Sequence, residues 1–267
     1  MIDYNENVIE DLKEFVYPNG LKYNSRKESA NAVANYFREC NPKTEKEYNH
    51  FYETCDDYMY ENAFCNKERS CKIRTRNLLH IFSKNNFRNV LEVGAGVGTY
   101  ALSLEQYGCD VDVIKSCDRA FDFFKWRIDK YKSSISIKES IDKKYDCIYF
   151  FDVIEHVLNP FHFLDDMCNH SDAIIFTHGF KVHTQSMGGY PQHFDFKFKN
   201  RNIDVNKWTI GNYPGIQQHI WLKGYDKIIY DGLRYPPHIF IKGYDRENKD
   251  IREYSMGGGK KGYWIND

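Results

Sequence analysis

The stretch from residue 89 to 98, NVLEVGAGVG, carries glycines at three alternate positions, Gly94, Gly96 and Gly98. A strand-like run precedes these glycines and a helical pattern follows them, which is the setting of a ligand-binding turn. Glycine suits such a turn because, without a Cβ, the backbone can bend tightly and a ligand can approach it closely. Glu92 adds an acid two residues before the first glycine. A tight turn without a ligand is the alternative, although three flexible glycines are costly without a use.

A second group of polar residues follows an apolar run in YDCIYFFDVIEHVLNP, residues 145–160. Asp152, Glu155 and His156 would share one face if the turn ran directly into a helix, because positions i, i+3 and i+4 are neighbours on a helix. Two carboxylates and an imidazole on one face could bind a divalent cation, with waters completing its shell. Alternatively, the acids stabilise the first helical turn, and the histidine serves as a base without a metal.

Alternating patterns between residues 88 and 180 predict the frame that positions these groups. Strands are expected at NVLEVG, CDVDVIK, SSISIKE, DCIYFFD and DAIIFTH, and helices at YALSLEQYG, RAFDFFKWRIDKY and IEHVLNPFHFLDDMCNH. This alternation predicts a parallel sheet with crossover helices, a doubly wound domain. DKIIYDG and PHIFIKGYD indicate two more strands, which could pair as an antiparallel hairpin at the sheet edge. We therefore predict an α/β fold with a mostly parallel seven-stranded sheet and helices on both faces.

The chain divides into three predicted parts. Residues 1–85 are polar, tyrosine-rich and helical in pattern, and we expect a helical N-terminal lid or substrate region there. Its three expected helices lie in SRKESANAVANYFREC, EKEYNHFYETCDDYMYENAF and RTRNLLHIFSKN. Residues 86–244 form the binding domain, and residues 245–267 a flexible C-terminal tail. The long aromatic and histidine-containing segment after the fifth strand favours a functional loop.

The glycine turn, with its acid two residues ahead, resembles motif I of class I S-adenosylmethionine-dependent methyltransferases. Residues 145–160 resemble the fourth strand and following turn of the same superfamily, most closely its small-molecule, ubiquinone-pathway-like branch. The resemblance covers about residues 88–180 and implies a Rossmann-like domain that binds S-adenosylmethionine. The residues expected to contact this cofactor are Glu92, Gly94, Ala95, Gly96, Gly98, Lys115, Asp118, Phe151 and Asp152.

Lys115 departs from the pattern of this family, because the resemblance implies an acid there that accepts hydrogen bonds from both ribose hydroxyls. An ammonium group has three donors and no acceptor, so Lys115 cannot take over that role unchanged. Three explanations stay open: a carboxylate from Asp112 or Asp118, donation from the lysine to a hydroxyl oxygen, or weakened binding. Asp118 follows Gly98 at a spacing close to that of a ribose-binding acid. It could equally be an acid at the start of the next helix.

The second segment also resembles the ExxEH ligand set of metal-dependent O-methyltransferases, with Asp152 in place of the first Glu. The resemblance implies a possible Mg²⁺ site formed by Asp152, Glu155 and His156, with His193 as a later histidine. Three histidines are candidate catalytic residues. They are His156, His193 and His178, which lies at the end of the fifth strand, where ligands of parallel sheets bind.

Composition argues against other classes of protein. The formal net charge of the 267 residues is −1, whereas phosphate binding generally needs a basic surface, so a nucleic-acid partner is not expected. No apolar run approaches about 18 residues, and the N-terminal stretch is acidic, so neither a membrane span nor a signal peptide is expected. Eight cysteines without a CxxC pair favour reduced thiols and a cytoplasmic location.

The sequence therefore predicts an S-adenosylmethionine-dependent methyltransferase that acts on an oxygen or nitrogen of a small molecule. Methyl transfer from a sulfonium is an in-line displacement, in which alignment and closure supply much of the rate. Three alternatives stay open: aminocarboxypropyl transfer or cyclisation with the same cofactor, metal-dependent RNA 2′-O-methylation, and a non-catalytic binding module. The sequence predicts no oligomeric state.

Overall fold

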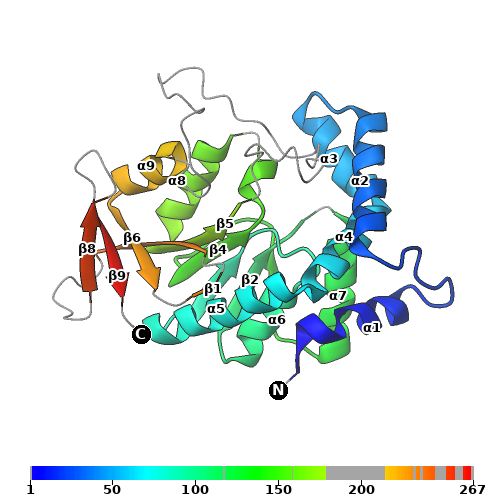
Figure 1. The fold of residues 1–267 in the computed structure, drawn as a ribbon, viewed down its shortest axis with the longest axis horizontal. Helices are drawn as coiled ribbons and strands as arrows, with labels where there is room; N and C mark the ends of the chain where they lie inside the picture. Colours follow the sequence, from blue (N-terminus) through cyan, green and yellow to red (C-terminus); the bar gives the residue numbers. More distant parts are fainter. Residues whose placement is uncertain are drawn as a thin grey trace. The chain divides into compact units, whose positions relative to one another are not determined.

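A computed structural model describes most of the chain. The described ranges are 2–116, 118–157, 159–178, 214–230, 233–234, 237–243, 251–255 and 261–265. The chain divides into two compact units, Met1–Asp142 and Lys143–Asp267, and Figure 1 shows their helices and strands. Each unit contains both helices and strands.

The first unit joins seven described helices to three parallel strands. Its helices are α1 (Tyr4–Phe15), α2 (Arg26–Cys40), α3 (Glu45–Thr54), α4 (Asp56–Lys67), α5 (Arg69–Asn85), α6 (Thr99–Gln106) and α7 (Arg119–Tyr131). Its strands are β1 (Asn89–Glu92), β2 (Asp110–Ile114) and β3 (Ser136–Lys138). They pair in parallel in the order β3-β2-β1, so their carboxyl ends meet at one edge. The helices α6 and α7 are the crossover connections that the alternating pattern predicts.

The N-terminal helices differ from the three that the sequence predicts. The expected helix over EKEYNHFYETCDDYMYENAF is two helices, because Cys55 ends α3 and begins α4. Helix α1 was not predicted, and it begins where the side chain of Asp3 accepts hydrogen bonds from two backbone N–H groups. Its apolar residues Tyr4, Val8, Leu12 and Phe15 recur at helical spacing behind the Asp3 cap, so this helix was predictable from the sequence.

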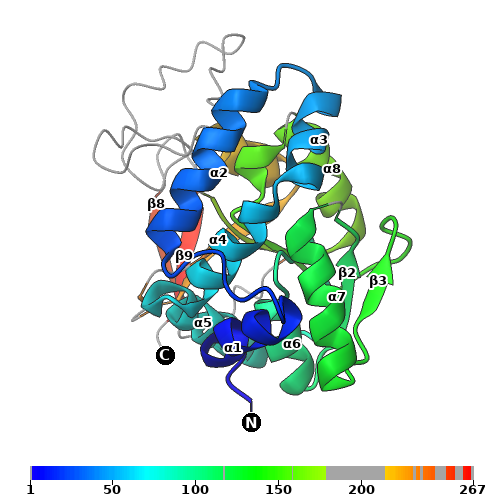
Figure 2. The same ribbon diagram turned by 90° about the vertical axis from the view of Figure 1, so that its right-hand side faces the viewer.

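Helix α1 belongs to the core of the first unit. Val8 and Leu12 pack in one buried cluster with Ala63 of α4, Val97 and Phe123 of α7, and Figure 2 shows α1, α4 and α7 beside one another. The N-terminal helices and the strand–helix region that follows therefore share one apolar core. The predicted boundary at residue 85 and the role of a lid stay predictions.

The second unit contains the remaining strands. Its elements are β4 (Cys147–Phe151), the 3₁₀ turn η1 (Ile154–His156), α8 (Pro160–His170), β5 (Ala173–Thr177), α9 (Pro214–Leu222), β6 (Tyr225–Tyr230), β7 (His238–Lys242), β8 (Ile251–Ser255) and β9 (Lys261–Ile265). They lie in the order β4-β5-β7-β6-β9-β8, in which β4 pairs with β5 in parallel and β7 runs antiparallel to β5 and β6.

The α/β class is confirmed, and strands β1 to β7 correspond to the seven expected. The antiparallel pair of β6 and β7 is also confirmed. Its expected place at the sheet edge is wrong, because β9 pairs with β6 on its other side. Strands β8 and β9 lie in the segment predicted as a tail, and α9 was not predicted.

The helix expected over IEHVLNPFHFLDDMCNH is wrong in its first part. Residues Ile154–His156 form a single 3₁₀ turn, and α8 begins only at Pro160. Proline lacks a backbone N–H and disfavours helical backbone at the preceding residue, so a helix ends before it. Asn159 caps α8 instead, with its side chain accepting a hydrogen bond from the backbone N–H of His162 at 3.2 Å.

The described residues bear on two expectations from composition, which concern membrane-spanning helices and the cysteines. None of the described helices is both long and apolar enough to cross a membrane. The described cysteines are free thiols. Two of them, Cys65 and Cys71, bring their sulfur atoms within 3.6 Å of each other.

Candidate active site

The glycine turn after β1 has the backbone conformation that its composition indicates. The φ angles of Gly94, Gly96 and Gly98 are 75°, 52° and 74°, in the left-handed region that side chains with a Cβ rarely adopt. The backbone N–H of Gly98 donates to the carbonyl of Ala95 at 2.8 Å and closes the turn. All three glycines are therefore required by the path of the backbone.

Two neighbours approach the turn so closely that a side chain would not fit. A Cβ placed on Gly98 would lie 1.9 Å from the ring of Phe124 in α7. A Cβ placed on Gly96 would lie 2.9 Å from Oδ1 of Asn62 in α4. Asn62, which the sequence did not single out, therefore lines the turn. Gly98 has a packing role that does not depend on a ligand.

Replacing Gly98 by alanine is expected to cost more stability than replacing Gly20 by alanine. Gly20 has nearly the same φ, 73°, and no atom within 4 Å of a Cβ placed on it, so it measures the backbone term alone, about 1–2 kcal/mol. Overpacking against Phe124 should add about 1–3 kcal/mol. Urea unfolding of both variants checks this difference, and equal losses would show that the ring of Phe124 yields without cost.

The helix after the turn begins without a side-chain cap. Gly98 is the N-cap of α6 and, without a side chain, makes no capping hydrogen bond to its first turn. Free backbone N–H groups at a helix start attract polar or anionic groups of a ligand. Glu92, at the end of β1, is 1% exposed. A turn of three glycines and a helix start without a side-chain cap together fit a cofactor with a polar tail.

A buried arginine holds the turn from inside the unit. Arg127 of α7 is fully buried, and its guanidinium donates to the carbonyl of Val97 at 2.7 Å and to Oγ1 of Thr99 at 3.1 Å. It also donates to Oδ2 of Asp11 in α1 at 3.0 Å and to the carbonyl of Tyr4 at 3.0 Å. Burial lowers the pKa of Arg127, and the Asp11 carboxylate opposes that shift. The sequence did not predict this contact, which links α1 to the candidate cofactor turn.

Lys115, directly after β2, is paired with an acid from the neighbouring strand. Its ammonium lies 2.8 Å from Oε1 of Glu139, which directly follows β3. Asp118 is the N-cap of α7, with its side chain accepting a hydrogen bond from the backbone N–H of Phe121 at 2.8 Å. The expected alternative of an acid at a helix start is thus confirmed for Asp118, whereas its contact with the cofactor stays a prediction. Burial raises the pKa of Asp118, and the hydrogen bond from Ser116 opposes that shift.

In the second unit, Asp152 directly follows β4 and has a strained backbone conformation. Its φ is 53°, which is uncommon for a residue with a side chain and often marks a functional site. Its Oδ1 accepts a hydrogen bond from Oγ1 of Thr177 at 2.9 Å, at the end of the adjacent strand β5. Phe151, the other cofactor contact expected here, is buried within β4.

His178 follows β5 and stacks on a histidine that the sequence did not indicate. Its ring is nearly parallel to that of His238 in β7, at 6° and with 5.1 Å between the centroids. Burial lowers the pKa of His178 to about 4, although the Asp152 carboxylate opposes the shift. Burial also lowers the pKa of His238 to about 3, with Lys227 acting in the same direction. Both rings are therefore neutral near pH 7.

The expected magnesium ligands do not fit a metal site. The helix that would align Asp152, Glu155 and His156 is replaced by a 3₁₀ turn, and the side chain of Asp152 already accepts the bond from Thr177. Glu155 is fully buried. Among the described residues, no three acidic, histidine or cysteine side chains are grouped closely enough to hold a metal ion. The fourth expected ligand, His193, lies outside the described residues.

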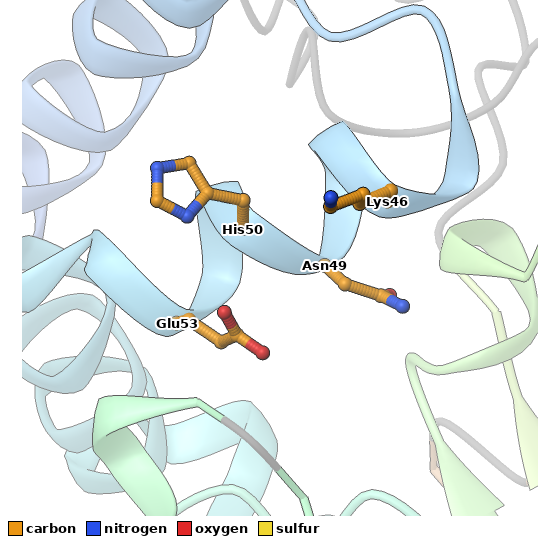
Figure 3. A pocket seen from close by; sticks show the side chains of 4 residues that line it. All are labelled: Lys46, Asn49, His50 and Glu53. Carbon is orange, nitrogen blue, oxygen red and sulfur yellow. The ribbon is translucent and has the colours of Figure 1, made fainter.

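A hollow on the first unit is lined by residues other than those of the candidate site. Its lining comes from one helix, α3, and Figure 3 shows the side chains along that helix: Lys46, Asn49, His50 and Glu53. All four are exposed. None belongs to the glycine turn or to the ends of the strands, so the hollow is not part of the candidate site.

A strand, a three-glycine turn and an uncapped helix, with a parallel strand alongside, define an α/β domain of the nucleotide-binding type. Residues 64–180 match the family of methyltransferase domains. This part of the chain is thus similar in sequence to methyltransferase domains. No curated protein is significantly similar to the chain in sequence.

Three solved structures are among those to which the chain is similar. The N-terminal domain of EvdMO1 with S-adenosylhomocysteine bound is 20% identical, over 42% of this chain and 51% of that chain, with a TM-score of 0.36. Magnesium protoporphyrin IX methyltransferase from Synechocystis PCC 6803, also with S-adenosylhomocysteine bound, is 11% identical over 81% and 97%, with a TM-score of 0.48. An O-methyltransferase family protein from Burkholderia thailandensis is 9% identical over 81% and 69%, with a TM-score of 0.49. The chain spans about half the length of the first of these.

Proposed function

We propose that this chain is an S-adenosylmethionine-dependent methyltransferase that acts on an oxygen or nitrogen atom of a small molecule. The observation that carries the proposal is the turn through Gly94, Gly96 and Gly98, which leads from β1 into the uncapped start of α6. Glu92 and Ala95 complete the set that would hold the cofactor in this turn. When bound, the cofactor supplies a methyl group on a sulfonium, ready for in-line displacement.

His178 is the residue proposed to accept the proton that the acceptor loses. The neutral imidazole of His178 would take up the proton that the acceptor oxygen or nitrogen loses when it is methylated, and the cofactor would leave as S-adenosylhomocysteine. Asp152, whose charge raises the pKa of His178, would stabilise the imidazolium that results. Since burial keeps the pKa of His178 near 4, its free base form is fully present at neutral pH.

A small-molecule acceptor is favoured over RNA by charge. The formal net charge is −1, whereas a protein that binds a phosphate backbone needs a surplus of Lys and Arg. The metal-dependent variant of that alternative also lacks support, since Asp152 and Glu155 do not form a ligand set with His156. His156 and His193 remain proposed catalytic residues, and His178 is favoured because it has an acidic neighbour, Asp152, and a stacked ring, that of His238.

The proposal is tested by methyl transfer in a reaction with mixed acceptors. The protein is incubated with S-adenosylmethionine labelled either on the methyl group or on the aminocarboxypropyl arm, with panels of phenols, carboxylic acids and amines. We expect the methyl label alone to enter a product, with one S-adenosylhomocysteine formed for each methyl transferred. Transfer of the arm label would instead establish the alternative chemistry, and transfer of neither would contradict the proposal.

Replacing His178 by glutamine is expected to lower the rate of methyl transfer by about 10²–10⁴-fold, the usual contribution of a general base. The matched control is His162→Gln in α8, since the side chain of His162 is 72% exposed. The rate is measured as S-adenosylhomocysteine formed at saturating cofactor. Equal rates in both variants would remove His178 from the mechanism.

A further inference from the structure

At the carboxyl ends of the strands in the first unit, a lysine stands where a carboxylate is expected to bind a ribose. Strand β2 lies beside β1 in parallel, so its carboxyl end shares an edge with the glycine turn, and ligands of parallel sheets bind at that edge. The ribose of S-adenosylmethionine or S-adenosylhomocysteine has two adjacent hydroxyl groups. One carboxylate can accept hydrogen bonds from both of them. The residue at the end of β2 is Lys115, which can only donate.

Two acids close to Lys115 in the sequence are already engaged. Asp112 lies inside β2 and is 3% exposed, and its carboxylate has the ammonium of Lys138 at 3.9 Å. Asp118 caps α7 through the backbone N–H of Phe121 and accepts a hydrogen bond from the hydroxyl of Ser116. Neither carboxylate is placed to receive a ligand at the end of β2.

Glu139 is the acid that the sheet brings to this position. Strand β3 runs parallel to β2, with Ile114 opposite Lys138, so Glu139 leaves β3 at the level where Lys115 leaves β2. The backbone N–H of Lys115 donates to the carbonyl of Lys138 at 2.8 Å. The Lys115 ammonium then meets Oε1 of Glu139 at 2.8 Å. The Glu139 side chain is 79% exposed, so its carboxylate is open to a ligand.

We propose that Glu139, oriented by Lys115, accepts the hydrogen bonds of the cofactor's ribose hydroxyls. The carboxylate that the end of β2 lacks comes instead from the end of β3, and Lys115 is a positioning residue that holds it. This inference rests on the proposed function, since it assumes the same cofactor. It concerns binding of the cofactor, and it can be tested without an acceptor substrate.

The test is calorimetric titration of the full chain with S-adenosylhomocysteine and with its 2′-deoxy analogue. Wild type is expected to bind S-adenosylhomocysteine about tenfold more tightly than the 2′-deoxy analogue, because the analogue lacks one hydrogen bond to a charged group. Glu139→Ala removes the acceptor of both hydrogen bonds, so it should lower the affinity for S-adenosylhomocysteine by more than about tenfold and bind the two ligands equally. Asp142→Asn, which changes another exposed acid just after β3, should bind both ligands as wild type does.

A charge exchange gives a second, independent readout. Glu139→Lys alone places two ammonium groups together and should bind S-adenosylhomocysteine at least about tenfold more weakly than wild type. Adding Lys115→Glu restores an ion pair with the carboxylate on the other strand, and should recover most of the affinity. Unchanged binding by Glu139→Ala, or an equal loss for both ligands, would overturn the inference and leave the proposed function intact. If wild type bound neither ligand, the proposed function itself would fail.

Discussion

Replacing Asp11 by asparagine is expected to lower the free energy of unfolding by about 3–5 kcal/mol, the usual cost of removing one partner of a buried ion pair. Asp11 is 1% exposed and Arg127 is fully buried, so the guanidinium would keep its charge without a counterion. The variant would also weaken the hydrogen bond that Tyr131 donates to Asp11 at 2.8 Å. Urea unfolding, followed by circular dichroism, measures the loss.

A matched control lies one residue away on the same helix. Glu10 pairs with Lys13 at 2.7 Å, with exposed side chains, so Glu10→Gln should cost less than about 1 kcal/mol. The double variant Asp11→Leu, Arg127→Met should be less destabilised than Asp11→Leu alone, because it leaves no buried charge. If Asp11→Asn cost no more than Glu10→Gln, the pair would not anchor α1 to the turn.

Acidification is expected to lower the free energy of unfolding by up to about 2.7 kcal/mol per pH unit through two buried histidines. Each proton that the unfolded chain binds in excess of the folded one contributes about 1.36 kcal/mol per pH unit. Burial holds the folded pKa of His178 at about 4 and that of His238 at about 3, whereas an unfolded histidine has a pKa of about 6.5. Below that pH the unfolded chain binds more protons than the folded one. Stability from both rings is therefore complete above about pH 6.5 and is lost as pH falls towards 4.

Variants separate this effect from that of the carboxylates. His238→Phe keeps an aromatic ring against His178 and Phe176, and should reduce the slope between pH 6.5 and 5 by about half. His162→Gln, on the exposed face of α8, should leave the slope unchanged. Unfolding by urea at pH 5, 6 and 7 gives the three slopes. If His238→Phe had the slope of wild type, burial of His238 would not set the acid stability.

Much of the fold could be predicted because its signals are local. Short apolar runs mark β1 to β7, and each parallel strand needs a crossover helix, so alternation alone indicates the α/β class. The three-glycine turn was also predictable, since the backbone path itself requires glycine at Gly94, Gly96 and Gly98. The break between η1 and α8 could have been predicted from Pro160, because a helix does not continue into a proline.

The remaining features depend on contacts between distant residues. Arg127 looks like one of several charged positions on an amphipathic helix, and only α1 packing on α7 shows that it is buried. Glu139 pairs with Lys115 through the register of β2 and β3, which no spacing along the chain encodes. His238 stacks on His178 because β7 lies beside β5 and runs antiparallel to it. The strand order that makes this contact was not predictable from composition or period.

The most direct test of the account is calorimetric titration of the wild-type chain with S-adenosylmethionine and S-adenosylhomocysteine, with Gly20→Ala and Gly98→Ala in parallel. We expect micromolar binding of both ligands by wild type and by Gly20→Ala, whose substitution lies in open space. Binding should be lost in Gly98→Ala, where the new Cβ displaces the turn. Absence of binding by folded wild type, or full binding by Gly98→Ala, would contradict the claim that this glycine turn holds the methyl donor.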